Sequence, residues 1–324
     1  MVGFSADFVS ALQHTLILTA TALAMSLIWS YLRVPEGNLL IIVFAFLSAV
    51  RISDFSSLKT RLKIISRMAV AAVLLQFAVS STCNVQILNI LLPAVGCRII
   101  LQKMTSASAY PVLLTGFLSY SAQPGVYAAA QRTIDILIAG TAALLITLSF
   151  PGKKSDSDST GEHFSKQEVL IQSFTIFCAI LLYKILSMSQ GIWIILTIIF
   201  IYIARHPGIS TGRLAYQRIF SVPAGILLGG IYSGTAAMFD SRLVYLAPLI
   251  GAAGFFKLFY RQDFFSFTLL FMAAFTICAD WMTGTYRDFN FLQFLFGRTL
   301  ATVIGTAVLL IVEKSASYSG AATT

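Results

Sequence analysis

Long apolar runs separated by short polar loops set the pattern of this chain. A bilayer core of about 30 Å requires about 20 apolar residues in a helix. Two runs, 37–50 and 191–204, are shorter than this. They can span the membrane only if flanking residues extend the helix or if the membrane is thinned there. The pattern predicts an all-α, polytopic integral membrane protein of about 12 transmembrane helices, with ten plus re-entrant segments as the alternative. The twelve runs are 10–32, 37–50, 64–81, 87–102, 108–122, 126–150, 168–188, 191–204, 218–238, 243–259, 264–281 and 291–313.

The loops between these runs differ strongly in basic residues. With twelve helices, fifteen of the 22 Lys and Arg residues fall on the side that holds both termini, and four fall on the other. Cytoplasmic loops carry the excess of Lys and Arg in membrane proteins. We therefore expect both termini in the cytoplasm and a multi-pass protein of the bacterial inner membrane.

The longest polar stretch, Pro151 to Gln167, divides the chain into two similar halves. Residues 37–81 resemble 191–234, and 131–146 resemble 297–311, so that Arg132 corresponds to Arg298. Because each half contains six helices, which is an even number, both halves enter the membrane in the same direction. Two parallel repeats with a substrate path between them are a recurring transporter architecture. We expect a six-helix repeat over 1–150, a cytoplasmic linker over 151–167, a second six-helix repeat over 168–314 and a cytoplasmic tail over 315–324.

Composition narrows the class of function. The chain is 57% hydrophobic and 11% charged, with mean hydropathy +0.84, which excludes a soluble enzyme, a nucleic-acid-binding domain and a disordered protein. The net charge of +9 is then a topology signal, so no nucleic-acid partner is expected. The four cysteines form no C-x-x-C pair, and no P-loop, H-E-x-x-H or G-x-S-x-G motif occurs. We expect no metal, no cofactor and no enzyme activity.

Charged residues inside apolar runs are the candidates for chemistry, because they cost about 2.5–3.5 kcal/mol each to insert. Arg132 and Asp135 share a helix face, and Arg298 occupies the position that matches Arg132. If the repeats face each other, the two arginines would bind a substrate carboxylate across their interface, and Asp135 would carry a coupled proton. In the alternative interpretation both arginines bond the carbonyl ends of neighbouring helices and Asp135 is a static partner.

A second acid, Asp280, lies beside Trp281 at the outer end of its run. It is a further candidate for proton coupling. The alternative is an interfacial cluster anchored by the aromatic ring, as is common where helices leave the membrane.

The stretch from Gly191 to Gly225 resembles the membrane signature of the fusaric acid resistance and aromatic acid exporter family. Trp193 and Thr197 match its aromatic- and Thr-bearing helix, and Arg218 matches the basic residue that opens the next helix. The resemblance adds these three residues to Arg132 and Arg298 as substrate-binding candidates. It implies proton-driven efflux of small aromatic or hydroxylated carboxylic acids, with a periplasmic adaptor of the membrane-fusion type as partner. The chain departs from the family in having Ala301 where the second repeat would carry its acid.

Two other classes of function are weighed against a transporter of organic anions. One is a structural or assembly subunit of an export complex, and the other is a membrane-embedded enzyme that modifies lipid or acyl groups. The scattered His, Asp and Glu residues disfavour the enzyme. Membrane lipid is an expected partner of the basic loops, and a homo-oligomer is left open.

Overall fold

The computed structural model describes residues 48–49, 52, 55–81, 86–118, 126–148, 163–188, 190–205, 209–236, 264–283 and 291–321. Every regular element in these ranges is an α-helix, which confirms the predicted all-α class. The helices are α3 (Leu58–Ser81), α4 (Gln86–Lys103), α5 (Ser106–Leu118), α6 (Val126–Leu148), α7 (Lys166–Leu186), α8 (Ile192–Ala204), α9 (Thr211–Ala236), α11 (Phe264–Thr283) and α12 (Phe291–Ala321).

Each described helix coincides with one apolar run, but several begin earlier than hydropathy indicates. Helices α3 and α9 begin inside basic loops, because Ser57 and Ser210 accept backbone N–H groups of their first turns and act as N-caps. A capping box of Ser165 and Glu168 begins α7 within the last residues of the expected linker. Helix α12 continues through most of the expected tail. The runs 10–32 and 243–259, nearly all of 37–50, and 151–162 of the linker lie outside the described residues.

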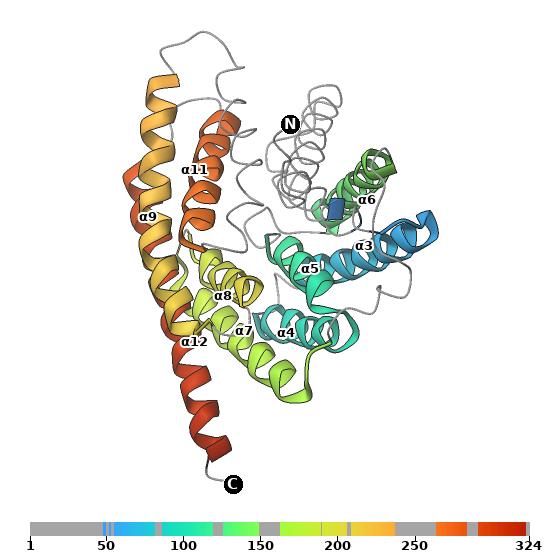
Figure 1. Ribbon diagram of the computed structural model, residues 1–324, viewed down its shortest axis with the longest axis horizontal. Coiled ribbons are helices and arrows are strands. Elements are labelled where there is room, and N and C mark those ends of the chain that lie inside the picture. Colours follow the sequence, from blue (N-terminus) through green and yellow to red (C-terminus); the bar gives the residue numbers. More distant parts are fainter. Residues whose placement is uncertain are drawn as a thin grey trace, which may run out of the picture.

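The arrangement places α8 in the middle of the described helices (Figure 1). It contacts α5, α7, α9 and α12, and nearly all of its side chains are buried. Helices α9, α11 and α12 pack together on one side of it, and α3, α5 and α6 pack together on the other. Side chains on α8 therefore meet residues that are distant in the sequence.

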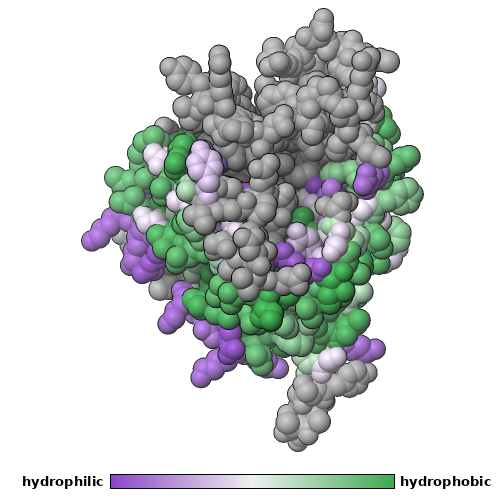
Figure 2. All heavy atoms as spheres, turned by 180° about the vertical axis from the view of Figure 1, so that it is seen from behind, coloured by the Kyte–Doolittle hydropathy of each residue, from purple (hydrophilic) through white to green (hydrophobic). Residues whose placement is uncertain are grey.

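Five described helices are long and apolar enough to cross a membrane: Leu58–Ser80, Ala129–Leu148, Lys166–Leu186, Thr211–Thr235 and Phe291–Ser317. Large apolar side chains are exposed along them, among them Leu74, Ile185, Ile231 and Phe296, and they form broad apolar areas on the surface (Figure 2). Such areas exceed what a soluble monomer exposes. The described part of the chain is thus that of a membrane protein.

The central helix α8 is too short to span a bilayer by itself. It has 13 residues, which is about 20 Å of helix against a hydrocarbon core of about 30 Å. Its side chains are apolar almost throughout, because packed helices surround it. The side chains of Trp193, Thr197 and Tyr202, which carry its polar atoms, therefore lie in the interior of the protein.

Candidate functional site

Arg298 stacks on the indole of Trp193, and this contact joins α12 to α8. The guanidinium carbon lies 3.3 Å from the centre of the Trp193 ring and 4.5 Å from that of Phe294. Its Nε donates to the Gln190 side-chain oxygen at 3.2 Å, and Nη1 lies 3.9 Å from the sulfur of Met272. Aromatic faces attract a guanidinium electrostatically. Arg298 is only 2% exposed, so its charge is held inside the protein by these contacts.

The close approach of α8 and α12 depends on Gly305. A Cβ atom at this position would lie 2.5 Å from the carbonyl oxygen of Ile194, closer than any side chain tolerates. Small residues let helices in membrane proteins approach in this way. Gly305 lies two turns beyond Arg298 on α12, and Ile194 directly follows Trp193 on α8. The close contact of the two helices is therefore near the contact of Arg298 with Trp193.

Arg218 is a second buried arginine, and it is fully enclosed. Its Nη1 donates to the hydroxyl of Thr268 on α11 at 3.3 Å, and its guanidinium carbon lies 4.5 Å from the centre of the Phe200 ring. Among the described residues its Nε and Nη2 have no hydrogen-bond partner. Buried donors in that state are costly. Helices α8 and α9 contain no acidic residue, so neither offers Arg218 a counter-ion.

The two arginines meet one face of α8. Trp193, Thr197 and Phe200 are spaced i, i+4 and i+7, so they share this face. The rise between the two aromatic positions is about 10 Å, and the positive charges of Arg298 and Arg218 repel each other across it. Thr197 lies between the two aromatic positions, fully buried, and its hydroxyl has no hydrogen-bond partner in the described part of the chain. We call Trp193, Thr197, Phe200, Arg218 and Arg298 the arginine site.

Helix α11 packs on α9 and closes another side of the arginine site. Gly225 on α9 packs on the backbone of Leu269, and a Cβ at Gly229 would lie 2.6 Å from the carbonyl oxygen of Ala273. This tight contact directs Thr268 toward Arg218 and Met272 toward Arg298. Glycines spaced four residues apart allow membrane helices to pack this closely.

Arg132 and Asp135 form a separate polar cluster between α6 and α3. Arg132 donates to the hydroxyl of Ser80 at 3.0 Å, and its charge interacts with that of Asp135 on the same helix. Asp135 is 1% exposed. One turn from Ser80, the Gln76 side chain donates to the carbonyl oxygen of Ala129 at 2.7 Å. The cluster therefore combines a buried cation and a buried acid.

The structure brings together four of the predicted site residues and separates the others. Trp193, Thr197, Arg218 and Arg298 lie in one site, whereas Arg132 does not face Arg298 as the repeat alone suggested. The reason is packing: α6 rests on α3, whereas α12 rests on α7, α8 and α9. Arg218, expected at the start of a helix, lies two turns inside α9. Asp280 falls in the last turn of α11, and its side chain lies outside the described residues.

Several residues of the arginine site were missed from the sequence. Phe200 and Phe294 read as ordinary core aromatics, although their spacings of i+7 from Trp193 and i−4 from Arg298 place them on the same helix faces. Thr268 lies in an apolar run whose charged residue, Asp280, is about three turns away. Helical periodicity indicates which residues share a face, but it does not show which helix lies opposite.

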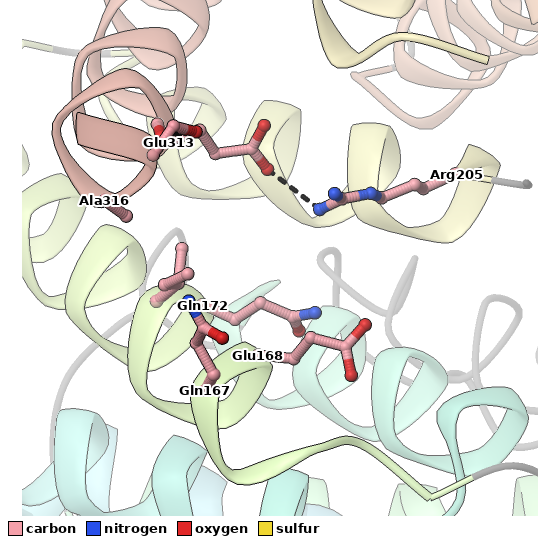
Figure 3. Close-up of a pocket in the computed structure, with 8 residues that line it drawn as sticks. Gln167, Glu168, Gln172, Arg205, Glu313 and Ala316 are labelled. Atoms are coloured by element: carbon pink, nitrogen blue, oxygen red, sulfur yellow. Dashed lines mark hydrogen bonds and ion pairs between the residues drawn. The ribbon is translucent and has the colours of Figure 1, made fainter. Parts of the chain in front are cut away.

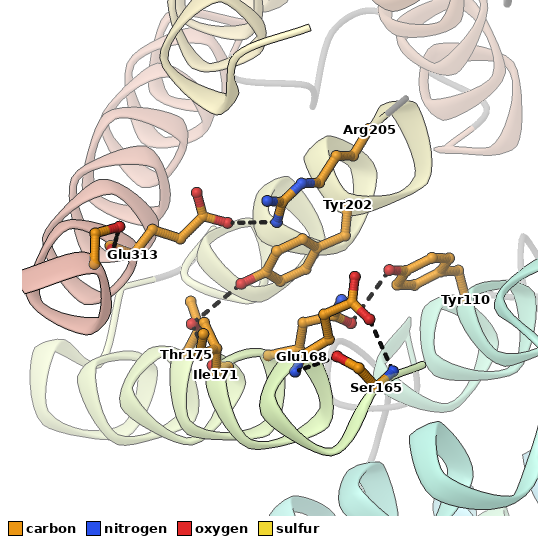
Figure 4. A network of polar contacts seen from close by, with 10 residues as sticks. Tyr110, Ser165, Glu168, Ile171, Thr175, Tyr202, Arg205 and Glu313 are labelled. Carbon is orange, nitrogen blue, oxygen red and sulfur yellow. Dashed lines mark hydrogen bonds and ion pairs between the residues drawn. The ribbon is translucent and has the colours of Figure 1, made fainter. Parts of the chain in front are cut away.

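A polar pocket of about 240 Å³ lies between α7, the end of α8 and α12 (Figure 3). Arg205 and Glu313 form an ion pair on one side of it, with Nη1 3.0 Å from Oε1. Gln167, Glu168 and Gln172 line it from α7. Two tyrosine hydroxyls connect the surrounding helices, one from Tyr202 to Thr175 and one from Tyr110 to Gln172, each at 3.2 Å (Figure 4).

Within the described residues no group of three His, Cys, Asp or Glu side chains is placed to hold a metal ion. The arginine site presents guanidinium N–H groups and aromatic faces, which suit an organic anion. No family model, no curated protein and no solved structure matches this chain. The resemblance to the fusaric acid resistance family therefore stays a prediction.

Proposed function

We propose that this chain is a secondary transporter of the bacterial inner membrane that exports small organic anions, with aromatic carboxylates as the preferred class. One observation carries the proposal: Arg218 is fully buried beside Phe200, and two of its guanidinium nitrogens have no hydrogen-bond partner among the residues that the structure describes. A carboxylate bound there would satisfy both donors at once, because a guanidinium presents its N–H groups as a planar fork. Burial strengthens such a charge-assisted pair, because the surroundings are low in dielectric constant.

The rest of the arginine site supports the same class of ligand. Trp193 and Phe200 provide aromatic faces on α8, and the unpartnered hydroxyl of Thr197 lies between them. An aromatic acid held by Arg218 would lie among these apolar and aromatic side chains and offer an oxygen substituent to the hydroxyl. Ligand sites commonly combine apolar walls with a few placed polar groups in this way.

We further propose that Asp135 carries the coupled proton. It is a buried acid next to Arg132, and intramembrane acids serve proton relays in transporters. Asp280 remains a second candidate for this role. In this proposal the acid and the anion site lie on different helices, so coupling proceeds through helix movement rather than direct contact.

The proposed architecture has twelve transmembrane helices in two parallel six-helix repeats, with both termini in the cytoplasm. Corresponding helices pair alike in the two halves, which supports it: α3 packs on α5 and α6, and α9 packs on α11 and α12. Membrane lipid and a periplasmic adaptor of the membrane-fusion type complete the proposed set of partners, and the chain has no enzymatic step of its own.

Uptake of labelled 4-hydroxybenzoate into inverted membrane vesicles tests this function. Vesicles that contain the protein should accumulate the label when a proton gradient is imposed, and an uncoupler should abolish accumulation. The Arg218→Gln variant should lose uptake, whereas Arg213→Gln, which changes an exposed arginine of the same helix, should retain it. If wild-type vesicles take up neither this nor other aromatic acids, the protein is better explained as an assembly subunit.

A further inference from the structure

The polar pocket at the ends of α7, α8 and α12 has the chemistry of a second anion site. Arg205 is the C-cap residue of α8, and its side chain is 47% exposed. Within the described residues its guanidinium makes one hydrogen bond, from Nη1 to Glu313. The remaining N–H groups are left for a ligand in the pocket.

A second donor reaches the pocket from α7. Gln172 is 97% buried, and its side-chain oxygen accepts the hydroxyl of Tyr110 at 3.2 Å. That bond orients the amide, and in the described structure its NH2 group has no protein partner. The pocket also lies at the first turns of α7, where the helix dipole favours an anion. Glu168 also lines the pocket, and one of its carboxylate oxygens is engaged at the N-cap, where it accepts the backbone N–H of Ser165 at 2.8 Å.

Glu313 occupies the place that a ligand carboxylate would take. It meets Arg205 through a single oxygen rather than through both, so the pair is not the strong bidentate kind. An ion pair with one partner nearly half exposed is weak. A carboxylate that enters the pocket can therefore compete with Glu313 for the guanidinium.

We propose that this pocket is an entry site, at which the carboxylate of the substrate binds Arg205 and Gln172 and displaces Glu313. The inference rests on the proposed transport function and adds a step to it. The displaced contact joins α8 to α12, the two helices that hold Trp193 and Arg298. Arg205 lies at the end of α8, and Phe200 beside Arg218 is less than two turns away. The entry pocket and the arginine site therefore share α8, the pocket at its end and the arginine site along its length.

The two members of the ion pair give opposite predictions, which separates this role from a structural one. The Arg205→Gln variant loses the ligand's partner, so the KM for 4-hydroxybenzoate uptake into inverted vesicles should rise about tenfold. The Glu313→Gln variant loses only the competitor, so KM should fall by about threefold to tenfold. Lys314→Gln changes a neighbouring exposed charge on α12 and should leave KM within about twofold.

A purely structural ion pair is broken by both substitutions alike, so KM shifts in the same direction for Arg205→Gln and Glu313→Gln would overturn the entry site. Unchanged KM in both variants would overturn it as well. Either result leaves the proposed function intact, because wild-type uptake would still be measured. Absence of uptake by the wild type would instead reject the proposed function. Thermal unfolding of each purified variant in detergent verifies that the comparison is made between folded proteins.

Discussion

The guanidinium of Arg298 lies over the ring of Trp193, with its central carbon 3.3 Å from the ring centre. These residues are more than a hundred positions apart in the chain, and each was a candidate for a different reason. Their contact orients Arg298 toward Met272 of α11 and leaves Arg218 as the cation with open donors. The arginine site therefore contains one cation that is held by aromatic rings and one that is available to a ligand.

Removing either aromatic partner of Arg298 should weaken both stability and transport. A buried cation–π contact is worth about 0.5–2 kcal/mol, so Trp193→Leu and Phe294→Leu should each lower the free energy of unfolding by at least that amount. Phe296→Leu is the matched control, because Phe296 lies on the same helix and is 70% exposed. Thermal unfolding in detergent and vesicle uptake measure the effects. Equal effects of Phe294→Leu and Phe296→Leu would argue against the stack.

Arg218→Met should make the unliganded protein more stable while abolishing uptake. A buried charge with incomplete hydrogen bonding carries a desolvation cost, and apolar replacements of buried ionic groups often stabilise by about 1–4 kcal/mol. Arg213→Met, at an exposed position of α9, should leave the melting temperature unchanged. A lower melting temperature for Arg218→Met would show that the arginine has a structural role, and normal uptake would remove it from the substrate path.

Asp135→Asn should separate substrate movement from the proton gradient. The amide cannot release a proton, so uptake driven by a pH gradient should be lost, whereas exchange of labelled for unlabelled substrate at equal pH should continue. Asp135→Glu keeps an ionisable group and should retain part of the gradient-driven uptake. Gradient-driven uptake by Asp135→Asn at the wild-type rate would exclude this acid and direct attention to Asp280.

Gly305→Ala should destabilise the contact between α8 and α12. Its new Cβ would lie 2.5 Å from the Ile194 carbonyl oxygen, and overpacking of this kind costs about 1–3 kcal/mol. Gly212→Ala, in the first turn of α9 with open space around it, should instead stabilise by about 0.5–1 kcal/mol. Melting temperatures of the two variants should thus move in opposite directions. An unchanged melting temperature for Gly305→Ala would mean that α8 and α12 can move apart without a loss of stability.

Most of the helices could be predicted from the sequence, because each depends on its own run of apolar residues. The starts of α3 and α9 could not, since hydropathy ignores the basic first turns that Ser57 and Ser210 cap. For the site, the burial of Arg132, Asp135 and Arg298 followed from their positions inside apolar runs. Arg218 was chosen only by resemblance, and nothing in the sequence placed Thr268 beside it.

The sequence by itself determined that this is an all-helical membrane protein, because the length and apolarity of a segment decide whether it enters a bilayer. It also determined which residues share a helix face, because that follows from 3.6 residues per turn. Only the tertiary structure decided that Arg298 joins Trp193 while Arg132 joins Ser80. The choice depends on which helices pack together, and that is set by close contacts such as that of Gly305 with Ile194, which no local pattern reveals.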